Sequence, residues 1–409
     1  MEQPAVDDLE TGFDRLLVES DDDIEETLRN DSFRNNAMVL PTDNVSDTES
    51  ETLSISNSES EDEWISDAEV HDEFVFSQQV GPYDCVHSCR EPIDFYELYL
   101  NGEMLSLIVG ETNRQGKAKD SNFQDTCPAE IKKFMGLCIQ MGVVQMPKLR
   151  DCWSTRPAIG GHSIAGKVMP RTRFEQLLNS LHFADNNQFD GNRLCKINDF
   201  LELFNANCEK AYRPEREVCI DESLVPFRGR IVFRQYVPFK RHKYGIKHFK
   251  LCCKGGYTWR TKIYAGRQPS RKDPVAVPVV MELMDGLLDQ SRHLCTDNWY
   301  SSVPLANSLL KRSTPLFGTL RKNRKGIPTK VKDRKLKRGQ VYYQQNQNGV
   351  LVLKWKDKRD LFMISTRHDG SMTPNGKPQV VEDYNKVMGF VDQSEQMSAY
   401  TPFVRRTTK

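Results

Sequence analysis

The chain has 409 residues, with 57 Lys plus Arg, 57 Asp plus Glu and 38% apolar residues. This length allows two or three domains with real cores, and no run approaches the roughly 18 apolar residues that cross a bilayer, which excludes an integral membrane protein. The acidic start, MEQPAVDDLE, excludes a secretory signal and a mitochondrial transit peptide, so we expect the cysteines to be mostly buried thiols of an intracellular protein.

The zero net charge hides a strong asymmetry along the chain. Residues 1–73 contain 24 acids and three bases, which leaves 54 bases and 33 acids for the rest. Residues 1–75 are rich in serine and poor in aromatic residues, so they are predicted to be a disordered acidic tail. An acidic tail ahead of a basic body is typical of a protein that binds nucleic acid.

Residues 76–216 have mainly helical spacing of apolar residues. Ile131, Phe134 and Cys138 follow Pro128 at steps of three and four, which predicts a helix that begins at the proline. The same spacing recurs from Phe174 and from Phe200. We expect a helical section here, with these apolar stripes forming its core; its role in dimerisation and DNA binding is implied only by the family resemblance carried by the motifs below.

From residue 217 the spacing changes to that of strands. Three short strands, the last two joined by Lys254-Gly255-Gly256, are followed by helix, strand, helix and strand, which predicts an α/β layer with a mixed sheet over 217–322. Residues 323–378 read as a small basic β insertion. The final element, DYNKVMGFVDQSEQM, reads as a loop entering a helix. The family resemblance carried by the motifs below implies that residues 379–397 form the last part of the core and that 398–409 begin a second helical section.

Two carboxylates lie in apolar runs of the predicted sheet. Asp221 falls within Val218–Val225, and Asp297 lies within Leu294–Tyr300. Taken singly, each is more simply read as an Asp that caps a turn at a strand end. A buried ionised carboxylate costs several kcal/mol unless it is paired or bound to metal.

The two aspartates together favour a metal site over two turn caps. Two strand-borne acids and a third from a helix form an oxygen site suited to Mg²⁺, and two such ions about 4 Å apart support phosphodiester cleavage. Asp392 and Glu395 lie three residues apart, so on a helix they share a face and can complete the site.

Two basic stretches are candidates for DNA contacts. In the first, Arg234 to Lys250, bases are mixed with aromatic residues, which suits contacts with phosphates and stacking on DNA. A solvated sheet edge with inward-facing aromatic residues is an equally good interpretation. The second, 321–338, holds ten bases and one acid, which suits phosphate binding, nuclear targeting or both, so we expect a nuclear protein. The candidate DNA-binding residues are Lys240, Arg241, Lys243, Lys247, Arg321, Lys322, Arg324 and Lys325.

Several long motifs resemble one known family. MPRTRFEQLLNSLHFADNN, IDESLVPFRGR, TDNWYSSVPLANSLL and DYNKVMGFVDQSEQM occur in the order found in the piggyBac transposases and the host proteins derived from them, over about residues 86–406. The resemblance implies an RNase H-like core in which Asp221, Asp297 and Asp392 are catalytic and hold two Mg²⁺ ions. It also implies double-stranded DNA as partner, a homodimer, hydrolysis at transposon ends and joining to a TTAA target.

The sequence departs from the family pattern in three places. Phe390 stands where the family commonly has glycine, which could change a loop, and Glu395 replaces a fourth Asp. The family continues beyond this chain's last residues, often into a zinc module, whereas the last cysteine here is Cys295. Cys85 and Cys89 lack a second ligand pair, so zinc is not expected. An active transposase, an inactive domesticated DNA-binding or chromatin-associated protein, and a simple metal nuclease remain open.

Overall fold

The computed structural model describes residues 64–66, 74–156, 164–188, 191–237, 242–266, 275–400 and 403. Almost all of the predicted acidic tail therefore lies outside the described residues. Within the described ranges, no helix combines the length and apolarity needed to cross a membrane.

The segment before the large sheet is helical, as predicted. α7 begins at Pro128, because proline lacks the backbone N–H that a first turn does not need. Phe134 of α7 packs on Phe174 of α9, with ring centroids 4.9 Å apart. The helices are α4 (Asp84–His87), α5 (Pro92–Tyr99), α6 (Gly102–Lys119), α7 (Pro128–Val143), α8 (Ala165–Val168), α9 (Arg171–Ser180) and α10 (Asn198–Ala211).

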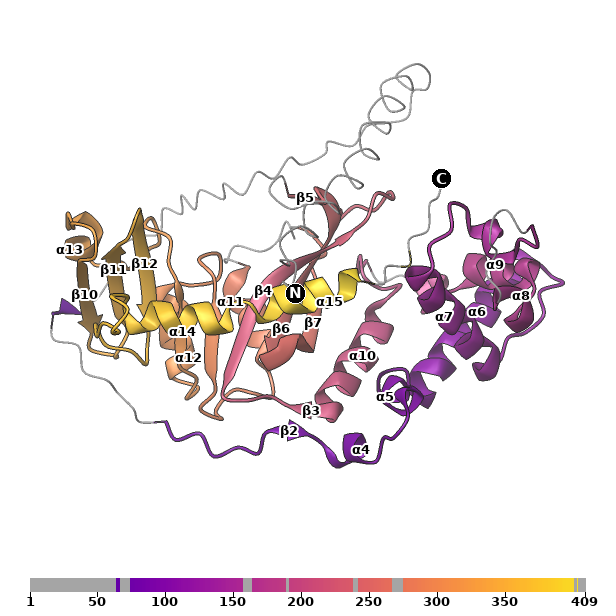
Figure 1. Cartoon of the computed structure of the whole chain (residues 1–409), viewed down its shortest axis with the longest axis horizontal. Helices are drawn as coiled ribbons and strands as arrows, with labels where there is room; N and C mark the ends of the chain where they lie inside the picture. The colour runs from indigo at the N-terminus through magenta and orange to yellow at the C-terminus, as the bar shows by residue number, and fades with distance from the viewer. Residues whose placement is uncertain are drawn as a thin grey trace, which may run out of the picture. The chain divides into compact units, whose positions relative to one another are not determined.

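A mixed ten-stranded sheet forms the centre of the fold (Figure 1). Its strands run in the order β1-β10-β11-β12-β9-β8-β4-β6-β5, and β7 pairs with β6 beside β5. The central pairs β4–β8 and β8–β9 are parallel, and the other pairs are antiparallel. The strands are β1 (Trp64–Ile65), β4 (Glu217–Pro226), β5 (Gln235–Tyr236), β6 (Tyr244–Cys253), β7 (Tyr257–Ile263), β8 (His293–Thr296), β9 (Leu316–Thr319), β10 (Val341–Asn346), β11 (Leu351–Lys356) and β12 (Asp360–Ser365).

The strands of the predicted insertion do not form a separate sheet. β12 pairs with β9, with Ile364 opposite Gly318, so β10–β12 and the short α13 (Thr329–Asp333) extend the main sheet. Periodicity identified these strands but does not specify which strand each one pairs with. On the far edge, β1 pairs with β10, which places Trp64 opposite Asn346. A second, two-stranded sheet joins β2 (Gly81–Pro82) to β3 (Tyr212–Arg213).

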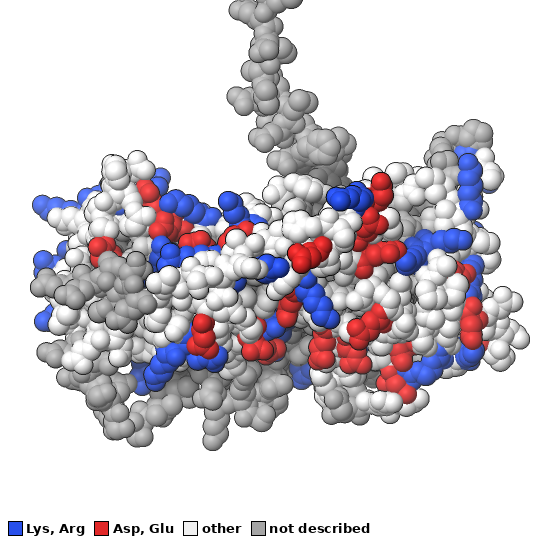
Figure 2. Space-filling model, turned by 90° about the horizontal axis from the view of Figure 1, so that it is seen from below, with Lys and Arg blue, Asp and Glu red and all other residues white. Residues whose placement is uncertain are grey.

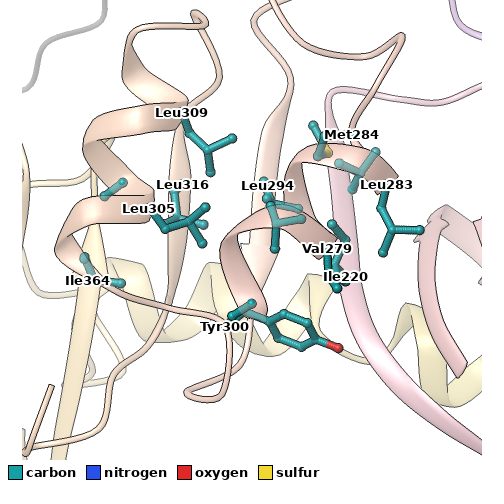
Figure 3. Packing of buried hydrophobic residues seen from close by; sticks show 14 of the residues in the cluster. Ile220, Val279, Leu283, Met284, Leu294, Tyr300, Leu305, Leu309, Leu316 and Ile364 are labelled. Carbon is teal, nitrogen blue, oxygen red and sulfur yellow. The ribbon is translucent and has the colours of Figure 1, made fainter. Parts of the chain in front are cut away.

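Helices cover both faces of the main sheet (Figure 1). On one face α11 (Ala276–Leu283) and α12 (Val303–Leu310) pack on Val218, Ile220 and Leu294, as Figure 3 shows for part of this core. On the other face α14 (Gln379–Val387) and α15 (Phe390–Ala399) pack on Cys219 and its neighbours. Because side chains alternate along a strand, successive residues of β4 serve different faces.

The last part of the core differs from the prediction. The stretch around Asp383 to Met388, read as a loop, is helical: Pro378 precedes the first turn of α14, and Val380, Val381 and Val387 pack on the sheet. The loop prediction was wrong because it gave more weight to the charged residues and to Gly389 than to the apolar residues at helical spacing. Gly389 has ordinary right-handed backbone angles, φ −73° and ψ −2°, so Phe390 simply begins α15 and no special loop is needed.

Candidate active site

The strand register brings Asp221 and Asp297 together. β4 and β8 run parallel, with Cys219 opposite Cys295 and Ile220 opposite Thr296. Asp221 follows Ile220 within β4, and Asp297 follows Thr296, the last residue of β8. Adjacent strands lie about 4.8 Å apart, so the backbones of the two residues are neighbours. The charge of Asp297 also contributes to the raised pKa of Asp221. Sites at the carboxyl ends of parallel strands are common because the connecting loops leave room for ligands.

Helix α15 brings the other two predicted acids to the same face of β4. Its buried residues Val391 and Ser394 anchor it, and it packs against β4 and β6. Glu395 accepts a hydrogen bond from the backbone N–H of Leu224 at 3.1 Å, so one of its oxygens is engaged with the strand. Asp392 lies in the first turn of α15 and is exposed.

The buried aspartates have perturbed acidities. Burial, followed by the charges of Glu222 and Asp297, raises the pKa of Asp221 well above its usual range, and Asp392 adds a smaller effect. Burial and the charge of Glu222 raise the pKa of Asp297 to about 6. Carboxylates whose charge is disfavoured in this way are candidates for cation binding.

A network of hydrogen bonds fixes the turn that carries Asp297. Its Oδ1 accepts the N–H of Trp299 at 2.8 Å, and Ser301 Oγ donates to its backbone carbonyl at 2.8 Å. Arg321 Nε donates to Asn298 Oδ1 at 2.8 Å, and Arg324 donates to the carbonyl oxygens of Asn298 and Trp299. The positive charge of Arg321 partly opposes the rise in the pKa of Asp297.

The predicted DNA-binding residues have different surroundings. Arg321 and Arg324 are partly buried against the Asp297 turn, whereas Lys322 and Lys325 are exposed. On the face seen in Figure 2, basic and acidic side chains are interspersed, so that face shows no continuous basic strip.

The basic stretch from Arg234 to Lys250 likewise contains both exposed and partly buried bases. Lys243 is exposed, while the side chain of Lys247 is 14% exposed and lies over the rings of Trp299 and Phe249, at 4.8 and 5.2 Å. Lys240 and Arg241 lie outside the described residues.

Two charged residues beside the aspartates were missed by the sequence reasoning. Glu222 follows Asp221 directly, and Lys250 lies opposite Asp221 in the β4–β6 register. Lys250 Nζ donates to Ser394 Oγ at 3.2 Å, and burial lowers the pKa of this lysine. The available signal was a lone charge in an apolar strand, in HFKLCC for Lys250 and in the run after Val218 for Glu222.

The aspartate pair suits a hard cation by its chemistry. Both donors are carboxylate oxygens, and both carboxylates are held where burial disfavours their charge, so a divalent ion would stabilise them. Among the residues that the structure describes, no group of three or more His, Cys, Asp or Glu side chains has the arrangement of a metal site. The three-aspartate metal site expected from the sequence therefore stays a prediction.

Comparison with known proteins decides the family. A family model described as Transposase IS4 matches residues 91–409. The human PiggyBac transposable element-derived protein 3 is 26% identical over 340 residues, and human PiggyBac transposable element-derived protein 2 is 27% identical over 330. The chain belongs to the piggyBac family of transposases. These alignments cover 77% and 75% of this chain, but 57% and 55% of the relatives, so the chain spans a little over half of their length.

The piggyBac fold is also found in a solved structure. A piggyBac transposase in a synaptic complex with hairpin DNA, determined by cryo-EM, superposes with a TM-score of 0.74 and 28% identity. The match covers 81% of this chain and 73% of that one. The mixed sheet flanked by helices thus agrees with the RNase H-like core expected from the sequence.

Proposed function

We propose that this chain cleaves and joins DNA strands at TTAA sites in the manner of a piggyBac transposase, with Asp221, Asp297 and Asp392 as its catalytic carboxylates. The observation that carries the proposal is the β4–β8 register, which sets Asp221 beside Asp297 at the carboxyl end of β8. The synaptic complex of the similar transposase supports DNA as the partner.

The chain's own residues have separable tasks in this proposal. Asp221 and Asp297, joined by Asp392 or Glu395 from α15, would hold Mg²⁺, which activates a nucleophile and stabilises the leaving oxygen. Arg321 and Arg324 hold the Asp297 turn rigid through Asn298 and Trp299. The exposed bases Lys243, Lys322 and Lys325, together with Lys240 and Arg241, would contact phosphates.

A strand-transfer assay tests the catalytic proposal. Purified full chain is incubated in Mg²⁺ with duplexes taken from the genomic sequence that flanks its gene and with a supercoiled plasmid that contains TTAA. We expect nicking and joined products with the wild type, and none with Asp221→Asn or Asp297→Asn. Products that persist in both variants would reject the three-aspartate assignment, and joining at sites other than TTAA would reject the target.

A second candidate is a domesticated DNA-binding or chromatin-associated protein without catalysis. It is favoured by the exposure of Asp392 and by the bond from the Leu224 N–H that engages Glu395, since both acids then lie outside the buried pair. Here the same duplexes bind in a gel-shift assay, but neither the wild type nor the variants produce nicks.

We also propose that the protein is nuclear and that it forms a homodimer. The basic run 321–338 supports a nuclear protein, and the family resemblance supports a homodimer. A fluorescent fusion with six of these bases changed to Gln should lose nuclear accumulation. Light scattering of the purified chain, with and without DNA, should give twice the monomer mass if the chain dimerises.

A further inference from the structure

Glu222 lies on the same strand as Asp221 but faces the other side of the sheet. Because side chains alternate along β4, Asp221 lies on the face of Cys219, which α15 covers. Glu222 lies on the face of Ile220, which α11 and α12 cover. The parallel pairing of β4 with β8 stops at Ile220 and Thr296, so the Asp297 turn adjoins β4 just where Glu222 emerges. Both faces of the strand therefore present a carboxylate to this turn.

A continuous set of contacts joins Glu222 to the Asp297 turn. Lys247 Nζ lies 4.0 Å from Glu222 Oε1 and 4.8 Å from the centre of the Trp299 ring. The Trp299 N–H in turn donates to Asp297 Oδ1 at 2.8 Å. In agreement with these contacts, the negative charge of Glu222 raises the pKa of both aspartates.

Two polar oxygens here have no partner in the described structure. Glu222 Oε2 and the Tyr300 hydroxyl are both buried and make no hydrogen bond. Tyr300 is fully buried, and Figure 3 shows its hydroxyl pointing toward β4, the strand that carries Glu222. Unsatisfied buried oxygens are rare in native proteins and call for a specific explanation, such as a bound ion or water.

We propose that Glu222 is a positioning residue of the acidic centre, which supplies the third negative charge that retains a divalent cation between Asp221 and Asp297, with Lys247 opposing it. The inference rests on the cation site of the proposed function. Glu222 fits this role because Asp392 is exposed and Glu395 is bonded to the Leu224 N–H, whereas Glu222 follows Asp221 directly and its Oε2 is buried without a hydrogen bond.

A purely structural role for Glu222 makes a different prediction. If the Glu222–Lys247 pair only stabilises the fold, removing either partner has the same consequence for the aspartates. If Glu222 attracts the cation, removing Glu222 weakens binding, whereas removing Lys247 strengthens it. The two substitutions should then change cation affinity in opposite directions.

Mn²⁺ binding to the full chain, followed by electron paramagnetic resonance of the free ion, tests this. The readout is the binding component that Asp297→Asn abolishes, which excludes weak sites on the acidic tail. We expect Glu222→Gln to weaken this component five- to tenfold and Lys247→Met to strengthen it two- to fivefold. Glu282→Gln, which removes the same charge from an exposed ion pair with Lys262, should leave it unchanged.

The outcomes separate the two claims. A wild type without any component sensitive to Asp297→Asn overturns the cation site of the proposed function and the inference with it. A wild type that binds, with Glu222→Gln within twofold of it or Lys247→Met weaker than it, overturns the inference alone. Melting curves in EDTA verify that each variant is folded, and Lys247→Met tests the claim by itself if Glu222→Gln does not fold.

Discussion

Asp297 is held by its hydrogen bonds in a place where burial disfavours its charge. The folded protein raises its pKa to about 6, above the roughly 3.9 of an unfolded chain, so the native state binds more protons between these values. Stability is therefore lost as the pH rises through this window in the absence of metal. The cation binding proposed for Asp297 needs the charged carboxylate that the fold disfavours.

Asp297→Asn should relieve this conflict. In EDTA at pH 8 we expect the free energy of unfolding to rise by about 1–2 kcal/mol, a value reduced for the partial exposure of the side chain, and the gain to vanish below pH 4. Urea unfolding at both pH values measures it. Asp289→Asn, at an exposed residue paired with Arg312, is the control and should change stability by less than about 0.5 kcal/mol. A variant less stable than the wild type at pH 8 would contradict the assignment.

The hydroxyl of Tyr300 is a second buried polar group that the fold leaves unfavourably placed. Because it has no hydrogen-bond partner, Tyr300→Phe should increase the free energy of unfolding by about 1 kcal/mol in metal-free protein. Urea unfolding monitored by circular dichroism measures the change. A loss of more than about 1 kcal/mol would mean that the hydroxyl bonds to a group that the structure does not show as its partner.

At the scale of elements, close approach of β8 and β9 depends on Gly318. A Cβ atom at this residue would lie 2.1 Å from the carbonyl oxygen of Thr296 and 2.8 Å from Ser301 Oγ. Ser301 Oγ donates to the Asp297 carbonyl oxygen and lies 2.8 Å from Thr296 Oγ1, so moving the strands apart would disturb this turn. The glycine thus connects sheet packing to the geometry of the carboxylates.

Gly318→Ala should destabilise the protein by about 3 kcal/mol or more, because backbone rather than a flexible side chain blocks the added methyl group. Gly389→Ala is the matched control: it has open space and ordinary helical angles, so stability should change by less than about 1 kcal/mol. Thermal melts of both variants measure this. Equal effects of the two substitutions would refute the packing argument.

Helix α14 is attached to the sheet by a buried histidine. His368 Nε2 lies 3.0 Å from Asp383 Oδ2 on α14, and His368 Nδ1 lies 2.8 Å from Ser365 Oγ at the end of β12. Burial lowers the pKa of His368 to about 4, so the ring is neutral at pH 7 and donates to the aspartate. The unfolded chain takes up a proton near pH 6.5, and stability falls as the pH drops from there to about 4.

His368→Gln should remove this pH dependence. We expect the wild type to lose on the order of 2–3 kcal/mol more than the variant between pH 7 and pH 4, although the variant is less stable at pH 7 through the lost contact with Asp383. Guanidinium unfolding across this range measures the two curves. Parallel curves would show that His368 is charged in the folded state.

At the scale of the whole molecule, a segment from before the helical section completes the edge of the sheet. β1 pairs with β10, and Trp64 packs on the same core as α11 and α12. Gln344 Nε2 donates to the Trp64 carbonyl at 3.4 Å. The strand is only two residues long, so its attachment depends largely on the tryptophan side chain.

Trp64→Ala should release this strand. Burying part of a tryptophan contributes on the order of 1–2 kcal/mol, so amide exchange along β10 should accelerate roughly tenfold, while exchange in β12 stays unchanged. Hydrogen exchange followed by mass spectrometry measures both strands. Unchanged exchange in β10 would mean that the pairing with β1 does not protect this edge.

The sequence predicted individual helices and strands better than the contacts between elements that are distant in the chain. The helix at Pro128 and the strand HLCT could both be predicted, because residues close together in the sequence decide the local backbone geometry. Asp221 and Asp297 were found because a charge in an apolar run is costly. The joining of β12 to β9 and the approach of Glu222 to Asp297 depend on residues far apart in sequence, and no local pattern encodes them.

The parallel register of β4 and β8, with α15 returning over β4, also has a temporal consequence. During translation, the residues around Asp221 leave the ribosome long before those around Asp392, and the whole insertion is synthesised between them. Contacts this distant in the chain form slowly. In a nascent or prematurely released polypeptide, the face of β4 that carries Asp221 therefore stays uncovered until synthesis has passed α15.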